Sequence, residues 1–542
     1  MMNASLKWQA ADWLNVVGRV NLDNSDYRNK NEKSASTLTT FCGVSGGFED
    51  AMRQERSLYA DFLANIDKTF GDFHLTANVG ASIYHTSMDQ LYIAGDLVIP
   101  NFFQINNINF SANYKPDPTG YEDEIQSIFA SAELSWKNQL YLTVTGRNDW
   151  DSKLAFSKQK SFFYPSVGLS ALLSEMVKLP EVISYAKIRG SYTVVASSFD
   201  RFLTNPGYEY NSQTHNWANP TVYPMDNMKP EKTKSWEIGL NLKFWGNRFN
   251  LDATYYRSNT LNQTFKVDIP SSSGYKQAIV QAGNVQNQGL ELALGFNDKW
   301  AGFGWSSNAT FTLNRNKVKR LASGSVNPVT GEAIQMDEMN VGWLGKENVA
   351  PRVILTEGGS MTDIYVYNQL TKDNNGNIKV DQNGNLGITS SNTPVKVGNL
   401  DADFNLGWTN HFTYKGIDLG VVLSARVGGL AYSATQGIFD YYGVSGTSAT
   451  ARDNGGIPIN NGKVNAQKYY QTIGTGEGGY GRYYLYSATN VRLQELTLGY
   501  TLPRSWFKDK IGLTVSFIGR NLWMIYNKAP FDPELTSSTG TY

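Results

Sequence analysis

Residues 231–259 read EKTKSWEIGLNLKFWGNRFNLDATYYRSN and contain two stretches in which apolar and polar residues alternate. The apolar positions of the first stretch are Trp236, Ile238, Leu240, Leu242 and Phe244. A period of two is typical of a β-strand with one apolar face. Gly246-Asn247 separates the two stretches, and both residue types tolerate the positive φ of a tight turn. The segment is therefore predicted to form a long antiparallel hairpin with a two-residue turn.

The length and the aromatic content of this hairpin favour a membrane setting. Each arm is long enough to cross a bilayer when tilted, which takes ~9–11 residues. Trp245 lies beside the turn, where an amphipathic ring would meet a membrane–water interface. A two-sided sheet in a large soluble β-protein would give one such hairpin equally well, so repetition along the chain has to decide.

The same pattern recurs from residue 6 to residue 523 and predicts about sixteen antiparallel strands. Every second connection is tight, for example at residues 12–13, 71–72 and 415–416, and the intervening connections are long. Long loops are expected at residues 266–286 and 427–486, and a loop with one short hairpin at residues 318–400. A slip of the alternation at Gln494-Glu495 predicts a β-bulge.

This asymmetry between short and long connections is typical of outer-membrane barrels, which have short periplasmic turns and long extracellular loops. Soluble sandwiches and propellers have no reason to place all long loops at one end. The predicted fold class is all-β, an antiparallel transmembrane β-barrel with long extracellular loops.

Composition limits the function classes. The chain of 542 residues has 48 basic and 48 acidic side chains, so no net charge favours nucleic acid as a partner. Mean hydropathy is −0.38, and no run of ~18 apolar residues is present to form a transmembrane helix. The single Cys42 lies in a glycine-rich loop and is interpreted as incidental. No signal-peptide pattern opens the chain, and the sequence is expected to begin after the true start of an exported protein.

Candidate catalytic and metal motifs are weak. Gly43–Gly47 has the spacing of a nucleophile elbow, and residues 474–479 are glycine-rich like a phosphate-binding loop. Neither motif has the preceding strand and following helix that such a site needs. The four histidines show no ligand spacing. Asp373–Asn377 and Asp381–Asn385 offer oxygen ligands that suit calcium, although two Asn-Gly turns explain them better. No enzyme activity, cofactor or metal is predicted.

Aromatic residues in the predicted extracellular segments are the candidate substrate-binding residues. They are Trp217, Tyr223, Tyr441, Tyr442, Tyr469 and Tyr470. Flat rings stack on sugar faces or anchor a partner, and as a group they are candidates to line a ligand vestibule. The alternative for each single residue is that a large loop needs a small apolar core of its own.

Several stretches resemble the SusC/RagA-like family of TonB-dependent outer-membrane transporters. They include Lys229–Thr233 with Trp236–Leu240, Arg147–Trp150, Phe163–Gly168, Gly283–Glu291, Asn490–Tyr500 and Gly519–Leu522. The resemblance covers essentially the whole chain. It implies an importer of oligosaccharides or peptides in the outer membrane of a Bacteroidetes-like Gram-negative cell, capped by a SusD-like surface lipoprotein and driven by the TonB complex.

The resemblance also implies that parts of the family pattern lie outside this sequence. Family members carry a plug domain and a TonB box before the barrel and end in a strand with a terminal aromatic residue, whereas this sequence stops at Gly540-Thr541-Tyr542 in a predicted loop. Residues 1–542 are therefore expected to be the C-terminal portion of the barrel, with about 16 of the ~22 strands of a plugged transporter. A passive porin and a soluble β-rich binding protein are the alternatives.

Overall fold

The structure is a computed structural model that describes residues 1–110, 116–204, 207–211, 216–225, 228–322, 326–334, 336–344, 350–474 and 481–534. Two stretches discussed from the sequence, residues 475–479 and 540–542, lie outside the described residues.

One large sheet dominates the molecule. It has 17 strands, and β11 (Val222–Tyr223) is a short parallel addition to β14. The others pair antiparallel in chain order. They are β1 (Met2–Ala11), β2 (Leu14–Lys33), β3 (Gly47–Phe70), β4 (Phe73–Asp96), β5 (Asp117–Trp136), β6 (Leu140–Asp151), β7 (Phe162–Leu172), β8 (Ile183–Ser197), β12 (Glu231–Phe244), β13 (Phe249–Asp268), β14 (Gln277–Trp300), β15 (Phe303–Arg320), β20 (Phe404–Tyr414), β21 (Ile417–Val427), β26 (Asn490–Thr501) and β27 (Thr514–Asn527).

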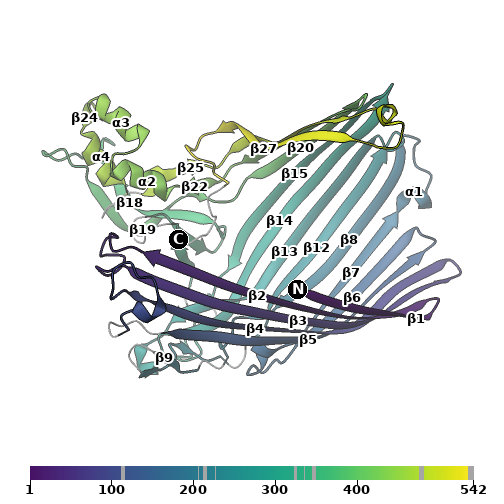
Figure 1. Cartoon of the computed structure of the whole chain (residues 1–542), viewed down its shortest axis with the longest axis horizontal. Helices are drawn as coiled ribbons and strands as arrows, with labels where there is room; N and C mark the ends of the chain where they lie inside the picture. The colour runs from purple at the N-terminus through teal and green to yellow at the C-terminus, as the bar shows by residue number, and fades with distance from the viewer. Residues whose placement is uncertain are drawn as a thin grey trace.

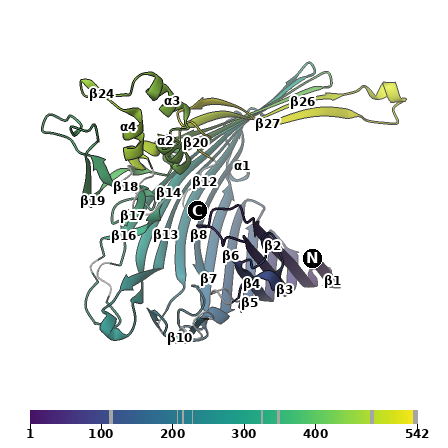
Figure 2. The ribbon, with the colours of Figure 1, turned by 60° about the vertical axis from the view of Figure 1, so that its left-hand side comes forward.

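This order confirms the prediction of about sixteen antiparallel strands. No pairing joins β1 to β27 among the described residues, so the sheet is an open, curved wall (Figure 1, Figure 2). The predicted bulge is also confirmed, because the pairing of β26 with both β21 and β27 skips Gln494.

The hairpin β12–β13 pairs over most of its length, with Ile238 opposite Tyr255 and Phe244 opposite Phe249. The predicted two-residue turn is wrong, because the strands are joined by residues 245–248. Trp245, Gly246 and Asn247 all have positive φ, at 48°, 65° and 69°. The Trp245 ring packs on Phe244 and Phe249, with centroids 5.9 and 5.3 Å away. These contacts offset the strain of a left-handed tryptophan.

The short connections lie at one end of the wall and the long ones at the other (Figure 1). The turns of β1–β2, β3–β4, β14–β15 and β20–β21 have two residues each. The connections β7–β8 and β26–β27 carry the short helices α1 (Leu173–Met176) and η5 (Arg504–Phe507). This segregation agrees with the predicted periplasmic and extracellular ends.

Two of the predicted loops contain β-strands. The predicted loop 266–286 is wrong, since β13 continues to Asp268 and β14 starts at Gln277. These extensions bury apolar residues such as Phe265, Val280 and Val285 in a cluster with Val318 and Leu321. Residues 318–400 contain not one hairpin but a four-stranded sheet. Its strands are β16 (Glu338–Trp343), β17 (Arg352–Thr356), β18 (Asp363–Leu370) and β19 (Ile388–Asn399).

The two faces of the large sheet differ in chemistry. Paired residues share a face, so the face of Ile238, Tyr255 and Leu290 continues across the neighbouring strands. This outer face is apolar and carries a chain of touching rings at the tight-turn end. Its members are Phe244, Trp245, Phe249, Phe296, Trp300, Phe303, Trp305 and Phe412. An apolar band edged by aromatic rings is the lipid-facing surface of an outer-membrane barrel.

Among the described residues, no helix is both long enough and apolar enough to cross a membrane.

Candidate functional site

The loop between β21 and β26 folds into a small helical unit at the long-loop end. It contains α2 (Ala434–Tyr441), α3 (Gly446–Asp453) and α4 (Ala466–Ile473), with the short strands β22 (Leu430–Tyr432), β23 (Ile457–Ile459), β24 (Gly462–Val464) and β25 (Leu485–Ser487). Ser433, Ser445 and Asn465 cap the three helices by accepting hydrogen bonds from backbone amides of the first turn. Side-chain caps of this kind are what makes helices of eight residues possible here.

This unit shares a core with the neighbouring loop sheet. Leu370 and Leu386 from the β18–β19 region pack with Tyr470, Ile473 and Tyr484 from the helical unit. The two long loops therefore fold as one extracellular body rather than as separate flexible loops. Tyr470 belongs to this core and Tyr469 packs against it. Two of the aromatic residues predicted to bind substrate therefore contribute to a small apolar core of the loops.

A buried carboxylate organises the helical unit. Asp440 is 5% exposed, and it accepts hydrogen bonds from the Thr447 hydroxyl at 2.9 Å, from the Gln436 amide at 3.0 Å and from the Ser445 hydroxyl. Three donors from α2 and the start of α3 thus converge on one side chain. The network fixes the angle between these two helices.

Removing the α4 cap is a direct test of this local order. Asn465→Ala removes the side-chain acceptor for the backbone amides of Gln467 and Lys468, 2.9 and 3.3 Å away. We expect the helical unit to lose about 1 kcal/mol of stability. Hydrogen–deuterium exchange should rise in residues 466–473 and stay unchanged in β12–β15. Equal exchange in both proteins would show that the cap contributes nothing.

Four of the six candidate aromatic residues come together in this unit. Tyr441, Tyr442 and Tyr470 line a pocket of about 500 Å³ between α2, α3 and α4. Tyr469 lies beside it, with its ring perpendicular to that of Tyr470 at 5.2 Å. Tyr442 is 72% exposed, whereas Tyr470 belongs to the shared core. The pocket thus has one exposed ring, Tyr442, which packs edge-on against Tyr441 at 5.1 Å, and one ring that is fixed in the core, Tyr470.

The other two candidates lie elsewhere. Trp217 sits on β10 (Asn216–Ala218), which pairs with β9 (Glu209–Asn211), and its ring contacts Tyr210 at 5.1 Å. Tyr223 packs edge-on against Tyr275 at 5.3 Å beside a buried apolar cluster. The structure therefore assigns Tyr223 a packing contact and leaves Trp217 exposed outside this pocket.

Polar groups complete the pocket. Arg452 donates a hydrogen bond to the Gly443 carbonyl at 2.8 Å, and Gln467 and Gln471 line the same hollow from α4. Sequence reasoning missed these three residues because it looked for aromatic rings. The available signal was helical spacing, since residues 467, 470 and 471 fall on one helix face.

Three buried or half-buried tyrosines of this body, Tyr469, Tyr470 and Tyr486, are kept neutral. Burial raises the pKa of Tyr469 and, together with the charge of Asp440, that of Tyr470. Burial also raises the pKa of Tyr486 to about 12. Neutral phenols, amides and one guanidinium can hydrogen-bond and stack on a neutral or acidic ligand without a change of protonation near neutral pH.

The two Asn-Gly turns form as predicted. Asp373 accepts hydrogen bonds from the backbone amides of Asn375 and Asn377 at 2.8 and 2.9 Å. Asp381 does the same for Asn383 and Asn385, both at 2.8 Å. These backbone donors lower the pKa of each carboxyl group. No group of three or more metal-ligating His, Cys, Asp or Glu side chains occurs in the described part of the chain.

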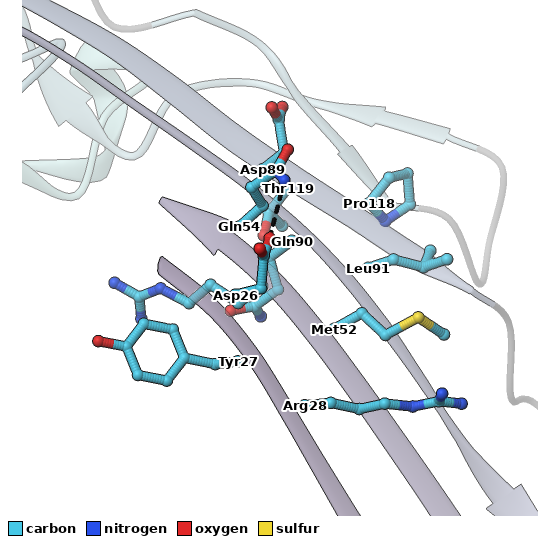
Figure 3. Close-up of a pocket in the computed structure, with 11 residues that line it drawn as sticks. Asp26, Tyr27, Arg28, Met52, Gln54, Asp89, Gln90, Leu91, Pro118 and Thr119 are labelled. Carbon is cyan, nitrogen blue, oxygen red and sulfur yellow. Dashed lines mark hydrogen bonds between the residues drawn. The ribbon is translucent and has the colours of Figure 1, made fainter. Parts of the chain in front are cut away.

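A second hollow of about 540 Å³ lies on the outer ends of β2–β5 (Figure 3). Arg28, Met52, Leu91 and Pro118 point to one side of the strands and Tyr27 to the other (Figure 3). Arg28 is held by Asp50 through two hydrogen bonds of 3.0 and 2.6 Å. The positive charge of Arg28 is therefore neutralised by Asp50 within the sheet.

The inner face of the sheet is lined by paired charges. Arg189 binds Asp252 through bonds of 3.2 and 2.9 Å, and its side chain lies over Gly239, where an added Cβ would come within 2.6 Å of Nε. Arg19 binds Asp61 in the same bidentate manner. Such a polar lining is expected of a barrel interior that holds water or a polar domain.

Comparison with known proteins identifies the family. Residues 1–345 match the family model described as "TonB dependent receptor-like, beta-barrel". The chain belongs to this family of TonB-dependent receptors. The match covers more than half of the chain and agrees with the antiparallel topology and the segregated loops. As a TonB-dependent receptor barrel, it is an outer-membrane protein.

Curated relatives carry the same family name. TonB-dependent receptor P3 of Formosa agariphila is 24% identical over an alignment of 535 positions, which covers 92% of this chain and 51% of that protein. TonB-dependent receptor SusC of Bacteroides thetaiotaomicron is 25% identical over an alignment of 437 positions, which covers 76% of this chain and 41% of SusC. The receptor barrel described here thus spans about half the length of these relatives.

Solved structures support the fold. The RagAB peptide importer in its open-open state superposes with a TM-score of 0.76 at 16% identity, over 99% of this chain and 58% of the matched chain. The closed-closed state gives the same TM-score. At this identity the likeness concerns the fold of the receptor barrel.

Proposed function

We propose that this TonB-dependent receptor barrel is the wall and the extracellular ligand vestibule of an importer that takes up an oligosaccharide or a peptide. The observation that carries the proposal is the pocket of Tyr441, Tyr442 and Tyr470 at the long-loop end, with Arg452 beside the rings. Aromatic faces with a few fixed polar groups are typical of small-ligand sites. The family supplies the energised mechanism.

The partners follow from the same membership. The TonB complex would act through a plug domain, and a SusD-like surface lipoprotein would cover the long-loop end. The polar inner face, where Arg189–Asp252 and Arg19–Asp61 pair within the wall, offers a plug a polar surface. A passive porin is the second candidate, since a polar lumen alone conducts solutes.

Uptake measurements test this function. Cells that make the receptor with Tyr441→Ala and Tyr442→Ala should take up their oligosaccharide or peptide with about tenfold weaker apparent affinity, because each stacked ring contributes about 0.5–1.5 kcal/mol. Phe41→Ala is the matched control, as Phe41 is 65% exposed on a different loop. Trp217→Ala tests the remaining candidate separately.

Energy dependence separates the two functions. Deleting the TonB complex should stop uptake if the receptor is an importer. Uptake that continues at the same rate would establish a passive porin. Equal affinity in the tyrosine variant and the Phe41 control would remove the pocket from the proposal.

A further inference from the structure

A row of basic side chains crosses β12–β15 on the outer face of the sheet. Trp236 pairs with Arg257, Arg257 with Gln288, and Gln288 with Arg315. In the next row outward, Lys234 pairs with Asn259, Asn259 with Gln286, and Gln286 with Lys317. Paired residues share a face, so all of these side chains lie on one surface. The basic row is defined here as Lys234, Arg257, Arg315 and Lys317.

The basic row begins where the apolar band ends. The row of pairs just inside it is Ile238, Tyr255, Leu290 and Leu313, all on the same outer face. The apolar run on β12 extends from Trp236 to Phe244 at the tight turn, about nine residues, which is the length of a strand that crosses a bilayer. The basic row therefore lies at the extracellular boundary of the membrane, at the depth of the lipid headgroups.

Charges within the protein do not neutralise this row. Arg315 is 3.7 Å from Asp403, a pair in which both side chains are more than half exposed and which is correspondingly weak. No ion pair joins Lys234, Arg257 or Lys317 to another side chain in the described ranges.

The acidic residues of β12–β14 closest to this row face the other way. Glu237, Asp252 and Glu291 alternate with the outer residues and lie on the inner face. Positive charge is thus concentrated on the surface that meets the membrane.

An unsatisfied acceptor lies inside the row. Gln286 is 5% exposed, and its Nε2 donates to Gln288 Oε1 at 2.7 Å. Its own side-chain oxygen has no hydrogen-bond partner in the described structure. A buried acceptor without a donor costs free energy.

The outer face of β2–β5 provides a contrast. Arg28 lies there, but Asp50 binds it through two hydrogen bonds, and Asp26 and Asp89 lie along the same hollow (Figure 3). That side of the wall is neutral or acidic. Excess positive charge is therefore a local property of β12–β15 and not of the whole outer boundary.

We propose that the basic row binds the phosphorylated headgroup of a lipid in the outer leaflet, with the phosphate between the four cations. Long basic side chains keep their charge at the headgroup level while their stems lie on the apolar surface. Each Lys or Arg near an anionic membrane surface contributes about 1 kcal/mol. The site is independent of what the receptor transports.

Lipid binding by the intact receptor in nonionic detergent tests this site. The probes are short-chain phosphatidic acid, short-chain phosphatidylcholine and inorganic phosphate. We expect salt-sensitive binding of phosphatidic acid that weakens on the order of 100-fold or more when Lys234, Arg257, Arg315 and Lys317 are all changed to Gln. The matched control changes four lysines at the tight-turn end to Gln, namely Lys178, Lys299, Lys508 and Lys510, and should bind like the unchanged receptor.

Each outcome decides the proposal. Equal loss in both quadruple variants would show a nonspecific effect of net charge and overturn it. If inorganic phosphate binds as tightly as phosphatidic acid, the ligand of the basic row is a free anion and not a lipid. If native mass spectrometry shows that the basic-row variant loses a bound protein but keeps its lipids, the row is a protein interface. If the quadruple variant does not fold, the pairs Lys234→Gln/Lys317→Gln and Arg257→Gln/Arg315→Gln should each weaken binding about tenfold.

Discussion

Arg492→Ala is expected to lower the free energy of unfolding of the receptor by about 3–5 kcal/mol, the cost of breaking a buried ion pair by removing one partner. The Arg492 side chain is 8% exposed and forms ion pairs with Asp532 at 2.7 Å and with Glu534 at 3.3 Å. It thereby fastens the segment after β27 to β26. Urea unfolding of the receptor in detergent measures the change.

Arg520→Ala is the matched control for this prediction. Arg520 lies on β27 and pairs with Glu495 of β26 at 2.9 Å, but its side chain is 74% exposed. An exposed pair contributes less than about 1 kcal/mol. Equal destabilisation by the two substitutions would contradict the assignment of Arg492 as the fastening residue.

The Arg492 contact should also depend on pH. Burial by itself would raise the pKa of Asp532, but hydrogen bonds from Arg492 and from the Glu534 amide lower it below its usual value. A carboxyl group with a lowered pKa contributes stability above its unfolded pKa of ~3.9 and loses it as pH falls through the lower folded value. The unchanged receptor should lose this contribution below about pH 4. Arg492→Ala should show a flatter acid dependence.

Strand number and direction could be predicted from the sequence because lipid imposes a period of two. Ile238, Leu240 and Leu242 had to share the lipid-facing side, and this requirement predicts both a β-strand and which of its residues face outward. Turn geometry was less predictable. Trp245 is left-handed because its ring packs on Phe244 and Phe249, and no local propensity favours that conformation.

The extracellular parts were harder to predict for a different physical reason. Outside the bilayer, nothing forces apolar and polar residues to alternate. The prediction therefore ended β13 and began β14 too close to the membrane, and it missed the extensions that bury Phe265 and Val280 in a local cluster. The helices of residues 434–473 are eight residues each and depend on caps and on Asp440. Aromatic content pointed to Tyr441, Tyr442 and Tyr470, but tertiary contacts brought Arg452 beside them.

The assignment of the two faces can be tested on adjacent, identical residues. Val421 and Val422 are neighbours on β21, and their side chains point to opposite faces. Val421 pairs with Leu496 on the outer face, whereas Val422 pairs with Glu495 on the inner face. Val421→Lys places a charge against lipid near the middle of the strand and should cost about 2–4 kcal/mol.

Val422→Lys is the matched control and should cost less than about 1 kcal/mol, because the new ammonium group lies in the polar interior opposite Glu495. Folding yield into lipid vesicles and urea unfolding from them measure both variants. A larger cost for Val422→Lys would reverse the two faces and, with them, the placement of the basic row at the membrane. Small and equal costs would mean that neither face meets lipid, which is the behaviour of a soluble β-protein.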